Sequence, residues 1–222
     1  MDSTTATKPD VSGETLSLLD LLFNGGIAGG IVISILLILL FIAMYIYFER
    51  FFAIKSASSY DKIFIQNITA EISKGNTEEA QKICVNTQTP FARITEKGIS
   101  RIGNGNSLED IRSTIQNAAE LEVYQLEKNT SILATISGAA PMIGFLGTVI
   151  GMVLAFHQLA TSSAQADMSL LAEGIYTAMT TTVAGLVVGI FAYLGYNHLV
   201  VKTDKVVNQM QQTATDFLDI IS

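Results

Sequence analysis

Three long stretches of the chain are apolar and lack Asp, Glu, Lys and Arg entirely; they lie at 21–48, 129–166 and 174–201. An α-helix rises about 1.5 Å per residue, so roughly 20 apolar residues cross the hydrocarbon core of a bilayer. Each stretch exceeds that length. The pattern therefore predicts an all-α polytopic membrane protein with transmembrane helices at 27–48, 132–157 and 171–199.

The polar segments between these stretches also have a helical pattern. In 49–131, apolar residues recur at the spacing of helices rather than with the alternation of strands. A helix that continues or closely follows the first span from Arg50 ends at Gly75, and Asn76 with Glu79 resembles a capping box that opens a short helix. We therefore expect long helical extensions and no separate α/β domain.

Two further helices are expected before the second span. The first follows Pro90 and ends near Gly103. The second is capped by Ser107 and Asp110 and meets no breaker before Gly138, so it would have about 50 residues if it ran unbroken into the span. The C-terminal tail keeps an apolar stripe typical of packing in a helical bundle, formed by Val206, Val207, Met210, Ala214, Phe217, Leu218 and Ile221.

The distribution of Lys and Arg orients the predicted spans. Segment 1–26 has one basic residue and segment 158–170 has none, whereas 49–128 has ten and 200–222 has two. By the positive-inside rule, 1–26 and 158–170 lie on the outer side of the membrane, and 49–131 and 200–222 lie in the cytoplasm. We expect the first span to be a retained signal anchor, because no basic n-region precedes it and its apolar run is too long and starts too late for a cleaved signal.

Composition argues against several other classes of protein. The chain has 49% hydrophobic and 15% charged residues, and its 13 basic residues are outnumbered by 20 acidic ones, which disfavours nucleic acid as a partner. The single Cys84 excludes an internal disulfide, and His157 and His198 add too few ligands for a Cys/His metal site. An intramembrane enzyme would need a base near Ser137 or Cys84, and the sequence offers none at a matching depth. We therefore expect no metal, no cofactor and no enzymatic activity.

Small residues mark the surfaces where the spans would pack. Gly147 and Gly151, like Gly185 and Gly189, have the four-residue spacing that lets membrane helices approach closely, and 26–30 repeats it. A proline just inside the second span removes one backbone donor and frees a carbonyl that a neighbouring helix or water must satisfy. The expected helix-packing positions are Gly144, Gly147, Gly151, Gly185, Gly189 and Pro141.

Threonine is the main polar residue of the last two spans. Thr148 lies near the middle of the second span, and the third contains Thr177, Thr180, Thr181 and Thr182. An isolated threonine usually bonds a carbonyl of its own helix, but four in six positions favour a further role. Thr177 and Thr181 share a face with Thr180 beside them, and Thr182 projects roughly 100 degrees further round. Such a polar face indicates a water-filled path, a wet seam or a partner helix.

Neither of these spans has an ionisable group in its middle. Threonine hydroxyls can orient or relay a chain of waters, but they do not store a proton as a carboxylate does. If protons cross here, another chain must supply the titrating residue. His157, at the outer end of the second span, is expected to be an interfacial residue.

Two segments carry a resemblance to a known family. The sequences GFLGTVIGM at 144–152 and LAEGIYTAMTTTVAGL at 171–186 closely resemble the signature helices of the ExbB/TolQ/MotA proton-channel family. Three spans fit its ExbB and TolQ branches better than the MotA branch, which usually has four. By position, Thr148 and Thr182 match the family's pore threonines, and Thr181 is the neighbouring hydroxyl.

This resemblance implies the channel subunit of an inner-membrane motor. Five subunits would surround the membrane helices of a single-span ExbD/TolR-like partner whose aspartate carries the proton, and the work would reach a TonB- or TolA-like protein. The implied function is to energise TonB-dependent outer-membrane transport, with Tol-type envelope maintenance as the alternative. Several family members have glutamate where this chain has Thr177. Glu173, one turn earlier, is either its substitute or a solvated residue at the helix end.

A passive membrane scaffold is the rival interpretation from another class of protein. In that case, the threonines and glycines only hold helices together. A neighbouring gene encoding a single-span protein with a membrane aspartate would favour the channel.

Overall fold

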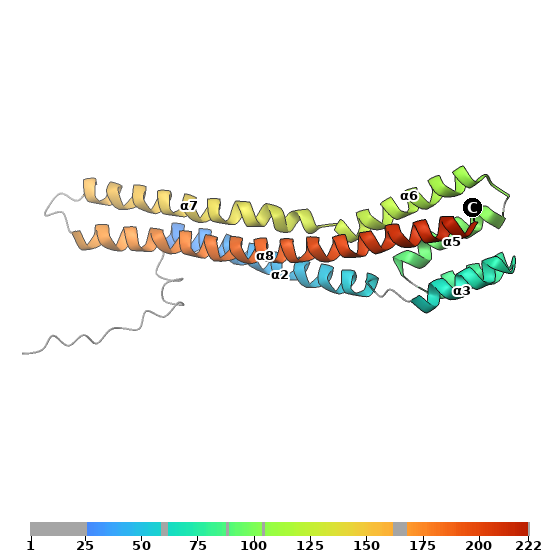
Figure 1. Cartoon of the computed structure of the whole chain (residues 1–222). Coiled ribbons are helices and arrows are strands. Elements are labelled where there is room, and N and C mark those ends of the chain that lie inside the picture. The colour runs from blue at the N-terminus through green and yellow to red at the C-terminus, as the bar shows by residue number, and fades with distance from the viewer. Residues whose placement is uncertain (1–25, 59–61, 88, 104, 162–167, 222) are drawn as a thin grey trace, which may run out of the picture. The chain divides into compact units, whose positions relative to one another are not determined.

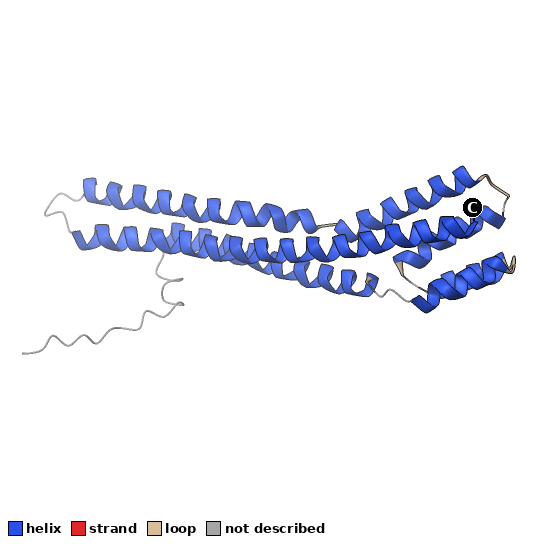
Figure 2. Cartoon of the chain, viewed as in Figure 1, coloured by secondary structure: helices blue, strands red, loops and turns tan. Residues whose placement is uncertain are grey.

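The computed structural model describes residues 26–58, 62–87, 89–103, 105–161 and 168–221. All regular structure within these residues is helical (Figure 2). The predicted periplasmic segment before residue 26 and the connection at 162–167 lie outside the described residues. The helices, several of which are labelled in Figure 1, are α2 (Gly26–Ala57), α3 (Lys62–Ser73), α4 (Thr77–Asn86), α5 (Pro90–Gly103), α6 (Leu108–Glu127), α7 (Thr130–Thr161) and α8 (Met168–Ile221).

Three helical stretches are long and apolar enough to cross a membrane. They are Gly29–Ala57, Leu108–Thr161 and Leu171–Asp219. The second stretch contains α6 and α7, and the third contains most of α8. This confirms the predicted all-helical architecture with three candidate spans, whereas the limits of each span within its stretch stay predictions.

The shorter helices follow most of the expected start and stop signals. Gly75, with a φ of 78°, follows α3, and α5 begins at the proline where a helix was predicted. The Ser107 hydroxyl accepts a hydrogen bond from the Asp110 backbone N–H at 3.2 Å, which confirms the predicted cap of α6. The predicted capping box at α4 is wrong, because Asn76 makes no side-chain cap bond and instead donates from Nδ2 to Glu71 at 3.1 Å.

The long helix expected to run into the second span is broken. α6 ends at Glu127 and α7 begins at Thr130, with Asn129 in the left-handed region at a φ of 64°. Asparagine adopts this conformation more readily than most residues, so the chain turns here without glycine or proline. Arg50 of α2 donates from Nη1 to the Gln125 carbonyl at 3.1 Å and so satisfies one of the last carbonyls of α6. The break missed by the sequence analysis is therefore stabilised from another helix.

Packing divides the chain into two units. The first unit comprises 1–38 and 139–188, and the second comprises 39–138 and 189–222. α2, α7 and α8 each contribute one part to each unit. In the first unit, the described parts of α7 and α8 lie side by side (Figure 1).

The core of the second unit is built from large apolar side chains. Within it, α3 packs on α4, α4 on α5 and α5 on α6. The stripe predicted in the tail contributes buried residues to this core, which confirms that it packs in a helical bundle. Among the most deeply buried side chains of the second unit are Ile54, Ile99, Ile115, Leu133, Leu199, Val206 and Met210.

Cys84, the single cysteine, lies buried in α4 of the second unit. Burial, together with the charge of Glu96, raises the pKa of its thiol to about 12. The thiol therefore stays protonated at neutral pH, and since the thiolate is the reactive form, Cys84 has the character of a structural residue.

Candidate functional site

In the first unit, α7 and α8 touch backbone to backbone at two glycines. A Cβ atom added to Gly144 would lie 2.6 Å from the Thr181 carbonyl oxygen, and one added to Gly185 would lie 2.6 Å from the Ala140 carbonyl oxygen. Both distances are shorter than any side chain tolerates. Small residues are used in membrane helices for this purpose, since they let backbones approach where no large side chain intervenes.

The close approach extends along the helix pair toward the start of α8. A Cβ added to Gly151 would lie 2.7 Å from Ala178 Cβ, and one added to Gly174 would lie 2.6 Å from Ala155 Cβ. An alanine of one helix thus meets a glycine of the other at each of these points. Gly147 lies between, where an added Cβ would come within 2.6 Å of the Thr181 hydroxyl.

Thr181 is buried at this contact, with 1% of its surface exposed. Its hydroxyl lies 2.7 Å from the Ala178 carbonyl of its own helix and 3.0 Å from the Gly144 carbonyl of α7. It therefore makes both the own-helix bond common for threonine and a bond across the helix contact. The Gly144 carbonyl is within hydrogen-bonding distance because glycine at this contact lets the two helices approach closely.

Thr148 and Thr182 are half-buried, and their hydroxyls are hydrogen-bonded to each other across the same contact. The Thr148 hydroxyl also lies 3.2 Å from the Ala178 carbonyl, and the Thr182 hydroxyl lies 3.3 Å from the Gly144 carbonyl. We call Thr148, Thr181 and Thr182 the hydroxyl cluster. Its three hydroxyls converge on the Gly144 carbonyl, the Thr148 hydroxyl lying 3.4 Å from it.

The hydroxyl cluster has the chemistry of a relay and lacks that of a proton store. Each threonine hydroxyl both donates and accepts a hydrogen bond, so the partly exposed pair can orient water. None of the three groups ionises near neutral pH. Two neighbouring helices thus present polar side chains at a depth where the surrounding side chains are apolar.

The remaining threonines of α8 are placed differently. Thr180 is 9% exposed and donates to the Thr177 carbonyl of its own helix at 2.6 Å. Thr177 is half-buried beside α2, where a Cβ added to Gly29 would lie 3.7 Å from its methyl carbon. The structure therefore separates these two from the hydroxyl cluster, although Thr177, Thr180 and Thr181 are close on the helix.

Two predicted polar candidates lie on the surface of the first unit. Glu173, near the start of α8, and His157, near the end of α7, are both exposed. Pro141 lies inside α7, which continues through it, and Gly189 is buried in the second unit. None of these four residues is hydrogen-bonded to the hydroxyl cluster in the described contacts.

The backbone part of the site was not predicted from the sequence. Gly144 was considered for its small size alone, and the role of its carbonyl as the common acceptor was not recognised. Ala178, whose carbonyl binds two of the hydroxyls, was not singled out. A signal was present in the spacing, because Gly144 and Ala178 lie four residues before Thr148 and Thr182, the distance from a helical threonine to the carbonyl it reaches.

These features define a class of protein, namely an all-helical chain with three candidate membrane spans and a hydroxyl cluster between two of them. Residues 86–212 match the model of the MotA/TolQ/ExbB proton channel family. The match covers more than half of the chain, both predicted signature segments and the hydroxyl cluster. The chain belongs to this family.

Individual relatives agree with the family match. The chain is 30% identical over 148 residues to a putative biopolymer transport protein ExbB homolog of Methanothermobacter thermautotrophicus, covering 65% of this chain and 50% of the relative. It is 35% identical over 102 residues to the Tol-Pal system protein TolQ of Haemophilus influenzae, covering 46% and 42%. It is 26% identical over 172 residues to the putative biopolymer transport protein ExbB-like 3 of Synechocystis, covering 77% and 81%. The chain thus spans half or less of the length of the first two relatives.

Proposed function

We propose that the chain is the channel-forming subunit of a membrane motor driven by the proton gradient. The observation that carries this proposal is the hydroxyl cluster, in which Thr148 and Thr182 bridge α7 and α8 while staying partly exposed. A hydroxyl pair that only held the two helices together would be as buried as Thr181. Partial exposure favours contact with water or with a further helix.

The cluster needs an acid from another chain. The uncharged run 129–166 and the run 174–201 contain no carboxylate, and His157 lies exposed near the end of α7, so the described parts of α7 and α8 around the cluster supply no acid to carry the proton. We propose that a single-span ExbD/TolR-like partner brings an aspartate next to Thr148 and Thr182. The hydroxyls then orient the waters through which that aspartate is loaded and unloaded.

The assembly we propose is a homo-pentamer around the membrane helices of this partner. The N-terminal segment lies in the periplasm and the tail in the cytoplasm of a bacterial inner membrane, as the distribution of basic residues supports. The output goes to a TonB-like protein and energises outer-membrane transport, with a TolA-like protein and envelope maintenance as the alternative. The two relatives above that are named for ExbB match longer parts of this chain than the TolQ relative, which favours the first output.

The proposal is tested by removing hydroxyls without changing side-chain shape. Thr148→Val and Thr182→Val are made in protein co-reconstituted with its partner in proteoliposomes, and proton flux is measured after a pH gradient is imposed. We expect a loss of about a hundredfold, the lower range of what a positioned proton-transfer group contributes. Thr148→Ser and Thr182→Ser keep the hydroxyl and retain flux.

Thr135→Val is the matched control on α7. The Thr135 hydroxyl is exposed and bonds only the Ser131 carbonyl of its own helix, at 3.0 Å. If both valine variants of the cluster assemble normally and keep wild-type proton flux, the chain acts as a passive scaffold and the proposal is wrong. Co-purification of the partner with each variant separates loss of flux from loss of assembly.

Glu173 gives a second, independent test of the path. If this exposed carboxylate collects protons at the entrance, Glu173→Gln lowers flux while leaving the hydroxyl cluster and the assembly unchanged. Unaltered flux in Glu173→Gln assigns Glu173 to the solvated helix end and leaves the proposal for the cluster in place.

A further inference from the structure

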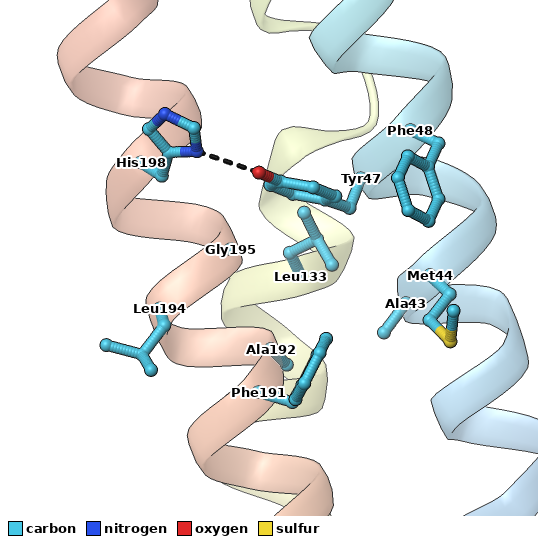
Figure 3. Close-up of a pocket in the computed structure, with 10 residues that line it drawn as sticks. All are labelled: Ala43, Met44, Tyr47, Phe48, Leu133, Phe191, Ala192, Leu194, Gly195 and His198. Carbon is cyan, nitrogen blue, oxygen red and sulfur yellow. Dashed lines mark hydrogen bonds between the residues drawn. The ribbon is translucent and has the colours of Figure 1, made fainter.

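The second unit contains a pocket of about 390 Å³ among α2, α7 and α8 (Figure 3). Its wall is almost entirely apolar and includes Ala43, Met44, Phe48, Leu133, Phe191 and Leu194. The volume lies in the range of pockets that hold small molecules, about 300–1,000 Å³, and the apolar lining with few polar groups is also typical of them.

One end of this pocket is polar. The Tyr47 hydroxyl lies 2.8 Å from His198 Nδ1, and Figure 3 shows this pair at one end of the lining, with Phe191 and Leu194 further along α8. Beside the pair, the Lys202 ammonium lies 5.1 Å from the centre of the Phe51 ring. The Phe51 ring in turn contacts the His198 imidazole, with ring centres 5.9 Å apart. The pocket therefore has an apolar body with the Tyr47–His198 pair at one end, which we call the mouth, and Lys202 lies next to that end without being one of the lining residues.

The mouth coincides with the point where each helix changes from uncharged to charged sequence. On α2, Tyr47 and Phe48 are the last residues of the uncharged run before Glu49. On α8, His198 is one turn before Lys202, where the run 174–201 ends. Since Tyr and other amphipathic rings gather at the membrane surface, the pocket body lies at the depth of lipid tails and its mouth at the depth of headgroups.

We propose that this pocket binds one anionic phospholipid. An acyl chain occupies the apolar body, and the phosphate is held by the Lys202 ammonium and by the Nε2–H of His198 when Tyr47 donates to Nδ1. Glu49 does not oppose the phosphate, because its carboxylate pairs with Arg50. This site is separate from the proposed proton path and does not rest on it.

Charge and depth select a lipid over a second copy of the chain as the occupant. Phe191 and Leu194 are 58% and 62% exposed in the single chain, so the body of the pocket opens outward, at the depth predicted for lipid tails. A second copy would need a carboxylate of its own beside Lys202 to match the charge, but Glu49, where its α2 run ends, already pairs with Arg50. An anionic headgroup supplies that charge directly.

The test counts lipids retained by the intact protein. The protein is placed in nanodiscs of equal parts dioleoylphosphatidylglycerol and dioleoylphosphatidylcholine, and native mass spectrometry measures how much of each lipid stays bound per subunit. Wild-type protein is expected to retain phosphatidylglycerol about fivefold over phosphatidylcholine, since one basic side chain near an anionic lipid contributes about 1 kcal/mol. Lys202→Gln brings this ratio close to one, whereas the matched control Lys205→Gln, one turn further along α8, leaves it unchanged.

A second variant tests the pocket body. Leu194→Trp fills the opening and lowers retention of both lipids several-fold, while Leu186→Trp, an exposed leucine of α8 that does not line the pocket, has no effect. Thermal unfolding of each variant in the same discs checks that the fold is kept.

Three results would overturn the proposal. Equal retention of the two lipids by wild type would mean nonspecific lipid around the protein. If Lys202→Gln and Lys205→Gln lower the ratio of the two retained lipids equally, basic residues attract the anionic lipid in general and there is no specific site. Unchanged retention in Leu194→Trp, together with an altered subunit count, would mean that a second copy covers the pocket.

Discussion

The two units of this chain pack their helices with different kinds of residue, small ones in the first unit and large apolar ones in the second. In the first unit, glycines and alanines bring α7 and α8 into backbone contact, and threonine hydroxyls reach across to carbonyls of the neighbouring helix. In the second unit, Gly98 faces the ends of the Phe217 and Ile115 side chains and Gly195 faces the Tyr47 ring, and the core is filled by large apolar residues.

We attribute this difference to the surrounding medium. The described part of the first unit consists of predicted membrane spans, whereas the second unit also includes the predicted cytoplasmic helices. In water, burying large apolar side chains stabilises by about 25 cal/mol per Å², so a bundle of isoleucine, leucine and phenylalanine holds itself together. In lipid that driving force between helices is absent, and close backbone approach with hydrogen bonds replaces it. In the first unit, the same close approach also creates the hydroxyl cluster, so packing and site cannot be separated there.

The largest expected effect comes from adding one methyl group at the backbone contact. Gly144→Ala would place Cβ 2.6 Å from the Thr181 carbonyl and 3.0 Å from Gly185 Cα, and neither atom can rotate away. The helices must separate, so we expect a loss of more than about 3 kcal/mol, beyond the usual cost of overpacking. Unfolding in mixed micelles measures it, together with proton flux, which falls as the hydroxyls lose their common carbonyl.

Gly138→Ala is the control for this change. Gly138 is also inside α7, but an added Cβ meets nothing within 4 Å, so the variant is expected to be as stable as wild type or slightly more stable. Equal stability of Gly144→Ala and Gly138→Ala would contradict the backbone contact on which the comparison depends.

A smaller loss is expected from an ion pair that belongs to the second unit. Arg93 of α5 donates from Nε and Nη2 to the two carboxylate oxygens of Glu122 of α6, at 2.7 and 2.5 Å. Arg93→Met leaves the buried Glu122 carboxylate without this partner. Breaking a fully buried pair costs about 3–5 kcal/mol and an exposed pair about 0–1, so about 1–2 kcal/mol is expected with Arg93 half exposed.

The dependence of this pair on pH and a matched control sharpen the measurement. Hydrogen bonding to Glu122 raises the pKa of Arg93. The contribution of Arg93 to the free energy of unfolding is therefore present in full below the ordinary pKa of arginine, and it is lost as the pH rises through the raised pKa. Lys82→Met breaks the exposed pair with Glu79 and is expected to cause no measurable change. A loss in Lys82→Met as large as that in Arg93→Met would show that burial of Glu122 does not matter.

The difference between the units also decides what the sequence could predict. The uncharged runs, the Ser107 cap, the helix start at Pro90 and the glycine spacings are local patterns, and they predicted several helix ends, the three candidate spans and small residues as packing positions in α7 and α8. The threonine pattern pointed to Thr148 and Thr182, and their assignment as pore threonines followed from a resemblance to a family. Their exposure and mutual bond did not, because these depend on how two helices far apart in sequence are rotated against each other.

The features that the sequence missed are non-local for the same reason. Asn129 is no strong breaker in isolation, and the turn there is stabilised by Arg50, about 80 residues earlier in the chain. The box expected at Asn76 failed because Glu71 binds its side chain instead. The pocket mouth joins Tyr47 to His198, which are 151 positions apart. Helical periodicity contains no information about such partners.

An intermediate effect is expected at a glycine of the second unit. Gly98→Ala would place Cβ 2.7 Å from the edge of the Phe217 ring and 3.0 Å from the end of Ile115, both of which can shift. Overpacking costs about 1–3 kcal/mol, and replacing a helical glycine by alanine returns up to about 1 kcal/mol. A net loss of about 1 kcal/mol is expected from thermal or denaturant unfolding. A loss as large as that of Gly144→Ala would erase the distinction between backbone and side-chain contact.

The smallest expected effect compares two buried threonines, one from each unit. Thr181→Val removes a hydroxyl that bonds across to α7, whereas Thr213→Val removes one that bonds only the Gln209 carbonyl of its own helix, at 2.9 Å. Valine keeps the shape in both cases, so the difference isolates the hydrogen bond between helices. Such bonds average about 0.6 kcal/mol in membrane proteins, and we expect about that loss for Thr181→Val and almost none for Thr213→Val. Unfolding free energies of the two variants in the same micelles decide this, and equal values would mean that glycine packing alone holds α7 and α8 together.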